Sequence, residues 1–122
     1  MGCGIPILNL PEINIISGDS ADISWTIQDN KGALTDIQFS TCTFSMAYYS
    51  GREDGAVIVK ECTATDMEGK GYNTFVLSLT SEETLDINGI FIYQLTITQL
   101  NGKVKSKQGV LNIYRNMNLI TL

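Results

Sequence analysis

The clearest pattern in the 122-residue chain is an alternation of apolar and polar residues with a period of two. It runs through two neighbouring segments, 72–80 and 90–97. Its apolar positions are Phe75, Leu77 and Leu79 in the first segment and Phe91, Tyr93, Leu95 and Ile97 in the second. Alternate side chains of a β-strand lie on one face, so the pattern predicts two strands that each bury one face.

The link between these two segments is polar and short. Thr80 or Ser81, followed by Glu83, is typical of the capped start of a helix and predicts one helical turn over residues 81–86. Leu85 and Ile87 are the apolar residues of the link. We expect both to point into the core.

Similar alternating segments fill most of the remaining chain. The predicted strands are residues 12–17, 20–28, 41–49, 56–63 and 103–114. Gly, Asn or Asp stands at every break, and Asn101-Gly102 is a strong signal for a two-residue hairpin. Trp25 lies in the middle of its strand and is expected in the core, with an exposed ligand platform as the alternative. Seven or eight short strands separated by turns predict an all-β sandwich.

The two ends of the chain differ from this central domain. We predict an N-terminal arm over residues 1–11, a β-sandwich domain over 12–114 and a C-terminal tail over 115–122. The apolar residues of the two ends are Ile5, Ile7, Leu8, Leu10, Leu119, Ile120 and Leu122. Apolar ends that are free in water are unfavourable, so each either lies along the sandwich or packs on a neighbouring protein. These seven residues are therefore the predicted partner contacts.

Composition argues against several functions. The formal net charge is −5, whereas nucleic acids and anionic membranes attract basic surfaces, so neither is expected as a partner. Lys103, Lys105 and Lys107 recur at a period of two and read as a solvated strand edge that discourages aggregation. The chain has no histidine, which removes the commonest general base and zinc ligand. No catalytic, metal-binding or cofactor-binding motif is present, and we expect no enzyme activity.

The chain has three cysteines, Cys3, Cys42 and Cys62, without a CxxC motif. Matching apolar residues across the hairpin pairs Val57 with Tyr48 and Val59 with Met46. That register places Cys42 and Cys62 on opposite faces, so both are expected to be free thiols. The start of the chain shows no secretory signal, and no segment reaches membrane-spanning length.

The tyrosines leave two interpretations open. The five are Tyr48, Tyr49, Tyr72, Tyr93 and Tyr114. Most fall on inward or boundary positions of the predicted strands, which favours packing. The alternative is an exposed aromatic platform that binds sugars.

The order of these segments resembles a known family, the immunoglobulin-like N-terminal domain of tailed-phage baseplate upper proteins and related phage or prophage tail proteins. The resemblance covers about Ile15 to Ile113. Its matching pieces are Gly18-Asp19, 23–27, Asp29-x-x-Gly32, 34–37, 42–46, Asp66-x-x-Gly69, 75–79, 80–85, Gly89-x-Phe91-x-Tyr93, Asn101-Gly102 and 109–113. The chain departs from the family at Phe91, where a tyrosine is usual, and it ends near Leu122, where the phage proteins continue.

The resemblance implies an immunoglobulin-like antiparallel β-sandwich of seven to eight strands with a structural role. Such a domain would anchor a receptor-binding or tail-fibre assembly to the baseplate, often with threefold symmetry. The expected partners are other phage tail or baseplate proteins, or further copies of the chain. The expected location is the virion tail, assembled in the host cytoplasm. The alternative function is a carbohydrate- or cell-surface-binding module of the same fold.

Overall fold

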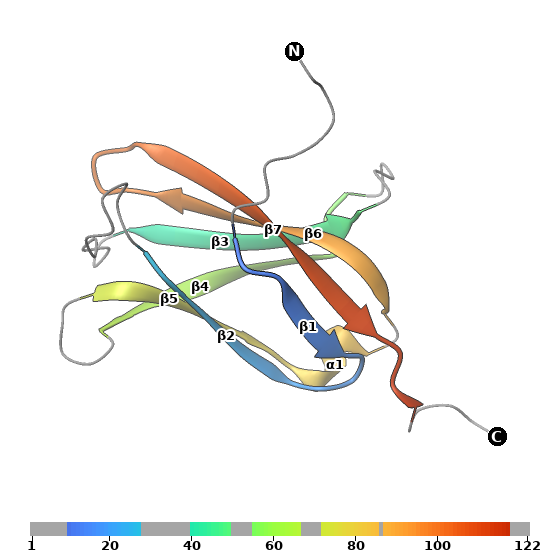
Figure 1. Cartoon of the computed structure of the whole chain (residues 1–122). Coiled ribbons are helices and arrows are strands. Elements are labelled where there is room, and N and C mark those ends of the chain that lie inside the picture. The colour runs from blue at the N-terminus through green and yellow to red at the C-terminus, as the bar shows by residue number, and fades with distance from the viewer. Residues whose placement is uncertain (1–9, 28–39, 50–54, 67–71, 86, 118–122) are drawn as a thin grey trace, which may run out of the picture.

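The computed structural model describes residues 10–27, 40–49, 55–66, 72–85 and 87–117. Within these ranges seven strands and one short helix form an all-β domain, as the alternation predicts (Figure 1). The elements are β1 (Ile13–Ile16), β2 (Ala21–Thr26), β3 (Thr41–Tyr48), β4 (Ile58–Asp66), β5 (Tyr72–Leu79), α1 (Ser81–Thr84), β6 (Gly89–Thr98) and β7 (Val104–Tyr114). The strand order is β1-β7-β6-β3-β4-β5-β2.

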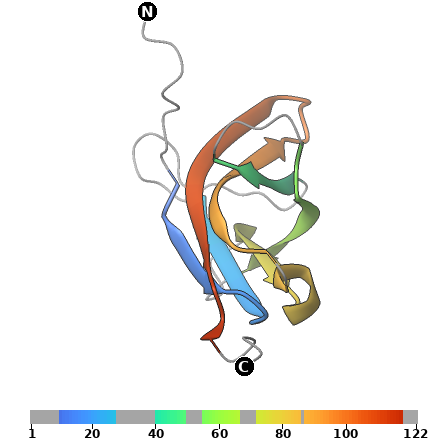
Figure 2. The same cartoon turned by 90° about the vertical axis from the view of Figure 1, so that its right-hand side faces the viewer.

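Strand β4 changes partner along its length. Its first half, residues 58–62, pairs with β3, and its second half, residues 63–66, pairs with β5. The sheet therefore bends at β4 and wraps around one core, so that it nearly closes into a barrel (Figure 2). Strands β1 and β2, the two ends of the strand order, come to lie next to each other (Figures 1 and 2).

One strand pair corrects the expectation of a purely antiparallel sandwich. Strand β1 runs parallel to β7, with Ile13 opposite Leu111 and Ile16 opposite Tyr114, whereas the other five pairings are antiparallel. A parallel pair needs a long connection, and here the connection is most of the domain, from β2 to β6. The period of a strand carries no information about its direction, so the sequence pattern could not predict this pairing.

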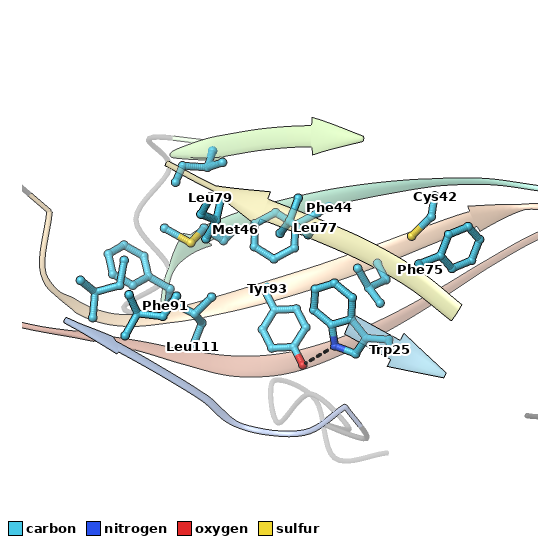
Figure 3. Packing of buried hydrophobic residues seen from close by; sticks show 14 of the residues in the cluster. Trp25, Cys42, Phe44, Met46, Phe75, Leu77, Leu79, Phe91, Tyr93 and Leu111 are labelled. Carbon is cyan, nitrogen blue, oxygen red and sulfur yellow. Dashed lines mark hydrogen bonds between the residues drawn. The ribbon is translucent and has the colours of Figure 1, made fainter. Parts of the chain in front are cut away.

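Except in β4, the core is formed by the predicted inward faces of the strands (Figure 3). Its fully buried side chains include Phe44, Phe75, Leu77, Leu79, Phe91, Tyr93, Leu95 and Leu111. Trp25 is also buried, which confirms the prediction that it packs in the core. Its ring lies 5.7 Å from that of Tyr93 and 6.2 Å from that of Phe44, measured between ring centroids. Such aromatic contacts add to the free energy gained by burying the rings.

The hairpin between β6 and β7 forms at Asn101-Gly102, but its loop is longer than the two residues predicted: the last ladder pair is Thr98 with Val104, and Gln99 N donates to Lys103 O at 2.8 Å. The two strands pair over their whole length, and Gly102 adopts a positive φ of 87°, which glycine tolerates best. Gly109 of β7 lies opposite Tyr93 and under its ring. A Cβ atom at position 109 would lie 2.7 Å from Tyr93 Cε1, so this position requires glycine for close packing.

The helical turn α1 begins as predicted. Thr80 is its N-cap: the Thr80 hydroxyl accepts a hydrogen bond from Glu83 N, and Glu83 Oε1 accepts one from Thr80 N. The expectation for Leu85 is wrong, because its side chain is exposed. Thr84 is the buried residue of the turn, and Ile87 packs against the core as predicted.

The register of β3 and β4 also differs from the prediction. Cys42 lies directly opposite Cys62, and Met46 lies opposite Ile58, so the cysteines share a face. Ile58 points inward, whereas Val59 is 61% exposed. The prediction failed because residues 56–59 are four consecutive apolar residues, which fit the core in either phase.

Candidate functional site: the outer face of the sheet

One end of the sheet carries apolar side chains on both of its faces. Phe91, Leu111 and Met46 point into the core, so their neighbours along each strand point outward. The outward positions at this end form what we call the apolar outer face: Ile16 of β1, Val110 and Tyr114 of β7, Ile90 and Ile92 of β6, Ala47 of β3, and Tyr49 just after β3.

Strand pairing makes these residues direct neighbours. Ile16 lies opposite Tyr114, Ile92 lies between Val110 and Ala47, and Tyr49 N donates a hydrogen bond of 2.9 Å to Ile90 O. Directly opposed side chains in a sheet are close enough to touch. The apolar residues of four strands therefore share one face, although Asn112, which lies opposite Ile90, separates the Ile16–Tyr114 pair from the row of Val110, Ile92 and Ala47.

These side chains remain open to solvent. Ile90 is 55% exposed, Tyr49 and Tyr114 are each 54% exposed, and Ile16 is 46% exposed. The other three members are half-buried. Each of these four half-exposed side chains exposes about 100 Å², so together they expose on the order of 400 Å² of largely apolar surface. Patches of this size on monomers are often functional.

No member of this surface is charged, and the polar residues next to its members include four amides: Asn112 lies among the apolar side chains beside Asn14, and Gln94 and Gln108 form the border. Asn14 Oδ1 accepts hydrogen bonds from Asn112 Nδ2 at 3.0 Å and from the Tyr114 hydroxyl at 3.1 Å. Gln108 Nε2 donates to Gln94 Oε1 at 2.9 Å in the next row. Amides both donate and accept hydrogen bonds, so this border can adapt to a partner without presenting a fixed charge.

The other end of the same face is mostly polar. Its outward residues are Thr41, Thr43, Thr96, Thr98 and Ser106, with one apolar residue, Val104, which is 59% exposed opposite Thr98. A half-apolar, half-polar sheet face is unusual for a face that meets only water, where polar residues prevail throughout. The contrast singles out the apolar end as the candidate site.

A buried polar cluster near α1 has a structural role. The Thr84 hydroxyl donates to Asp19 O at 2.8 Å and accepts from Gly18 N at 2.9 Å, while Ser17 Oγ donates to Thr84 O at 2.9 Å. These bonds tie the β1–β2 turn to the helical turn. They satisfy buried polar groups and leave Thr84 no hydroxyl proton for chemistry.

A second polar group lies in the core beside the arm. The Tyr93 hydroxyl donates to Pro11 O at 2.5 Å and accepts from Trp25 Nε1 at 3.3 Å. Burial raises the pKa of Tyr93, and the hydrogen bond from Trp25 opposes that rise. Tyr93 therefore stays protonated and fixes the end of the arm to the core.

The ion pair found among the described residues, Lys60 with Glu83, involves no member of the apolar outer face. Lys60 Nζ lies 2.8 Å from Glu83 Oε1 and also donates to Ser78 O at 2.6 Å. The pairing with Lys60 lowers the pKa of Glu83, and the bond from Thr80 N adds to it. The predicted lysine row, 103–107, is exposed on the half of β7 that β1 does not reach.

Of the seven predicted partner contacts, only Leu10 belongs to the described residues. Its backbone N donates to Gln108 O at 3.0 Å, and its side chain packs against the domain's own core. The other six, Ile5, Ile7, Leu8, Leu119, Ile120 and Leu122, lie outside the described residues. Their role as contacts stays a prediction.

The tyrosines divide between the two interpretations. Tyr93 is fully buried, and Tyr48 packs against Phe91 at a centroid distance of 4.7 Å. Tyr49 and Tyr114 are exposed on the apolar outer face. Among the described residues, no group of three or more His, Cys, Asp or Glu side chains could hold a metal ion, and no helix is long and apolar enough to cross a membrane.

Sequence reasoning missed the apolar outer face, although part of its signal was visible. The segment Ile90–Ile92 is apolar in both phases of the alternation, and Val110 and Tyr114 lie opposite the buried phase of β7. An outward Ile or Tyr in one strand is common. Only the strand order β1-β7-β6-β3 shows that such residues from four strands adjoin.

Comparison with known proteins supports the fold alone. No protein-family model and no curated protein matches the chain. The chain is similar to the crystal structure of CopC from Methylosinus trichosporium OB3b, with 12% sequence identity, a TM-score of 0.51 and 89% of each chain covered. A candidate glycoside hydrolase from Bacteroides vulgatus ATCC 8482 aligns at 10% identity and a TM-score of 0.42, over 85% of this chain and 16% of that chain, and carries no argument. The chain thus shares the β-sandwich-like architecture of CopC.

Proposed function

We propose that this chain is a non-enzymatic structural protein of a phage or prophage tail. Its domain would be an immunoglobulin-like sandwich that docks to a neighbouring tail or receptor-binding protein. The observation that carries this proposal is the apolar outer face, a charge-free surface on a chain whose net charge is −5. The order of sequence motifs supplies the phage context.

The exposed apolar surface favours docking over chemistry. Covering it would remove on the order of 400 Å² of apolar surface from water, worth up to about 10 kcal/mol at 25 cal/mol per Å² before the costs of association. The polar groups buried nearby, at Thr84 and Tyr93, already have partners within the fold. The face therefore suits a partner that is flat, apolar and uncharged, such as another β-rich tail subunit.

The two apolar ends would extend this contact. The predicted contacts outside the described residues are Ile5, Ile7, Leu8, Leu119, Ile120 and Leu122, whereas Leu10 packs against the domain's own core beside Gln108 of β7. Met117 follows the outer face at Tyr114 and is 74% exposed. A partner on the outer face would thus also lie near Met117.

The test is incorporation into virus particles. The gene is deleted in the strain that produces tailed particles, and the wild-type chain, Ile90→Lys or Thr41→Lys is supplied in trans. Both variants add one positive charge to the same sheet face, but only Ile90 belongs to its apolar end. Quantitative mass spectrometry of purified particles then measures incorporation.

We expect Ile90→Lys to reduce incorporation at least about tenfold, because burying an unpaired ammonium in an apolar contact costs more than 1.4 kcal/mol. Thr41→Lys should incorporate normally. Absence of the wild-type chain from particles would refute the tail function. Equal incorporation of both variants would refute the outer face as the docking surface.

The second candidate function is carbohydrate or cell-surface binding. Tyr49 and Tyr114 favour it, since both are half-exposed on one face at one end of the domain. Aromatic rings stack on the apolar faces of sugars while their hydroxyls bond to sugar hydroxyls. A glycan array should then give specific signals that Tyr49→Ala and Tyr114→Ala each abolish, and a silent array would exclude this function.

A further inference from the structure

We propose that Cys42 and Cys62 form a thiol–disulfide site, which reacts with small disulfides of the glutathione class and closes an intramolecular bond between β3 and β4. This inference goes beyond the proposed function and does not depend on it. It rests on the register of two strands and on the unequal exposure of two thiols.

The strand register brings the two cysteines together. Cys42 and Cys62 are direct partners in the antiparallel β3–β4 pair, so their side chains point to the same face. Directly opposed residues in such a pair have Cα atoms about 4.5 or 5.5 Å apart, and both spacings fall within the 4.4–6.8 Å range of disulfides. The bond can therefore form without a change of register. Both thiols are free in this structure.

The two thiols are suited to different steps. Cys42 is 1% exposed, whereas Cys62 is only half-buried and accessible to a small reagent. A hydrogen bond from the Cys42 thiol lowers the pKa of Cys62, and the same bond together with burial raises the pKa of Cys42. Cys62 is thus the thiol that ionises first and attacks, and Cys42 is the one that resolves.

The reaction balances with glutathione disulfide as the oxidant. The Cys62 thiolate attacks one sulfur of glutathione disulfide, which breaks that S–S bond and releases one glutathione thiolate. Cys42 then gives its proton to solvent and attacks Cys62 Sγ, displacing the second glutathione thiolate. Two protein thiols become one disulfide, and one glutathione disulfide becomes two glutathione molecules.

The position of the pair gives the bond a structural consequence. Cys62 is the last residue of β4 that pairs with β3, and Thr63 is the first that pairs with β5. The bond would therefore fasten the sheet where β4 changes partner. Cys62 is half-buried and packs against the core, opposite the fully buried Cys42.

The test uses the full chain with Cys3→Ser, which removes the third thiol. The folded protein is equilibrated with defined ratios of oxidised to reduced glutathione, and peptide mapping locates every disulfide. We expect a 42–62 cross-link and an intact mass lower by two hydrogens. The equilibrium constant for forming this cross-link should be roughly 100-fold larger in the folded protein than in guanidinium, because the bond closes a loop of about 20 residues. For the same reason, the Tm of the oxidised protein should lie about 10 °C above that of the reduced protein.

Control variants test the order of the steps. Cys42→Ser should stop at the mixed disulfide on Cys62, whereas Cys62→Ser should leave Cys42 largely unmodified. Unmodified Cys42 and Cys62 in the folded Cys3→Ser protein would overturn the proposal. So would separate glutathionylation of both cysteines, or a cross-link that forms no more readily in the folded state than in guanidinium.

Discussion

At the residue scale, Tyr93 connects parts of the chain that are far apart in sequence. Its ring packs on Trp25 and covers Gly109, and its hydroxyl joins Trp25 Nε1 to the carbonyl of Pro11. The alternation of β6 predicted that Tyr93 points inward. It could not predict the hydroxyl's partners, because they come from residues 68 and 82 positions away.

The first prediction is that Tyr93→Phe destabilises the domain by about 1–3 kcal/mol. The ring is kept, but the buried Trp25 N–H and the Pro11 carbonyl both lose a partner, and an unsatisfied buried group costs that much. Urea unfolding followed by tryptophan fluorescence measures the change. Tyr114→Phe is the control, because its hydroxyl bond to Asn14 is exposed and should change the free energy of unfolding by less than about 0.5 kcal/mol. Equal effects of the two substitutions would contradict this role for Tyr93.

At the element scale, the sequence predicted strands well where only one phase of the alternation is apolar. Strands β3, β5, β6 and β7 bury the residues that their patterns select, such as Phe44 and Leu77. The predicted inward face of β4 was wrong, because residues 56–59 are apolar in both phases of the alternation. Its register with β3 then depends on the partner strand and not on the local pattern. The parallel β1–β7 pair and the adjoining outer residues likewise depend on strand order, which no local pattern encodes.

The helical turn gives the second prediction, which concerns pH. The pairing of Glu83 with Lys60 holds the pKa of Glu83 below its value of 4.5 in the unfolded chain. A lowered folded-state pKa contributes stability above the unfolded pKa, and this contribution is lost as the pH falls through the folded-state value. Glu83→Gln should therefore lower the free energy of unfolding at pH 7 by up to about 1 kcal/mol, since the pair is partly exposed.

The difference between Glu83→Gln and the wild type should shrink as the pH falls below 4.5, and thermal unfolding over a pH series measures it. Glu82→Gln is the matched control, an exposed carboxylate one residue away in α1. It makes the same change in net charge without removing the contact to Lys60. A pH-independent difference for Glu83→Gln would mean that the lost ion pair is not its cause.

At the scale of the whole molecule, the distribution of charge and apolar surface governs association. Among the described residues, the charged side chains lie on turns, on strands β2 and β4, on α1, on the free half of β7 and next to the ends of β1 and β7, whereas the apolar outer face carries none. Net negative charge opposes self-association in water, and an uncharged apolar face favours it. Salt that screens charge and strengthens apolar contacts should therefore shift the balance towards association.

The third prediction is that ammonium sulfate drives the chain to associate through the apolar outer face. Ile90→Lys should raise the salt concentration needed for association, because it removes an apolar side chain from the centre of the face and places a charge there. Thr41→Lys makes the same change in net charge at the polar end of the same sheet face. It should change the salt concentration needed for association only by the effect of one added charge, and so by less than Ile90→Lys does. Static light scattering across a salt series measures the second virial coefficient of each protein. If the two lysine variants shift it equally, net charge rather than this surface controls association, and the docking assignment loses its support in the isolated protein.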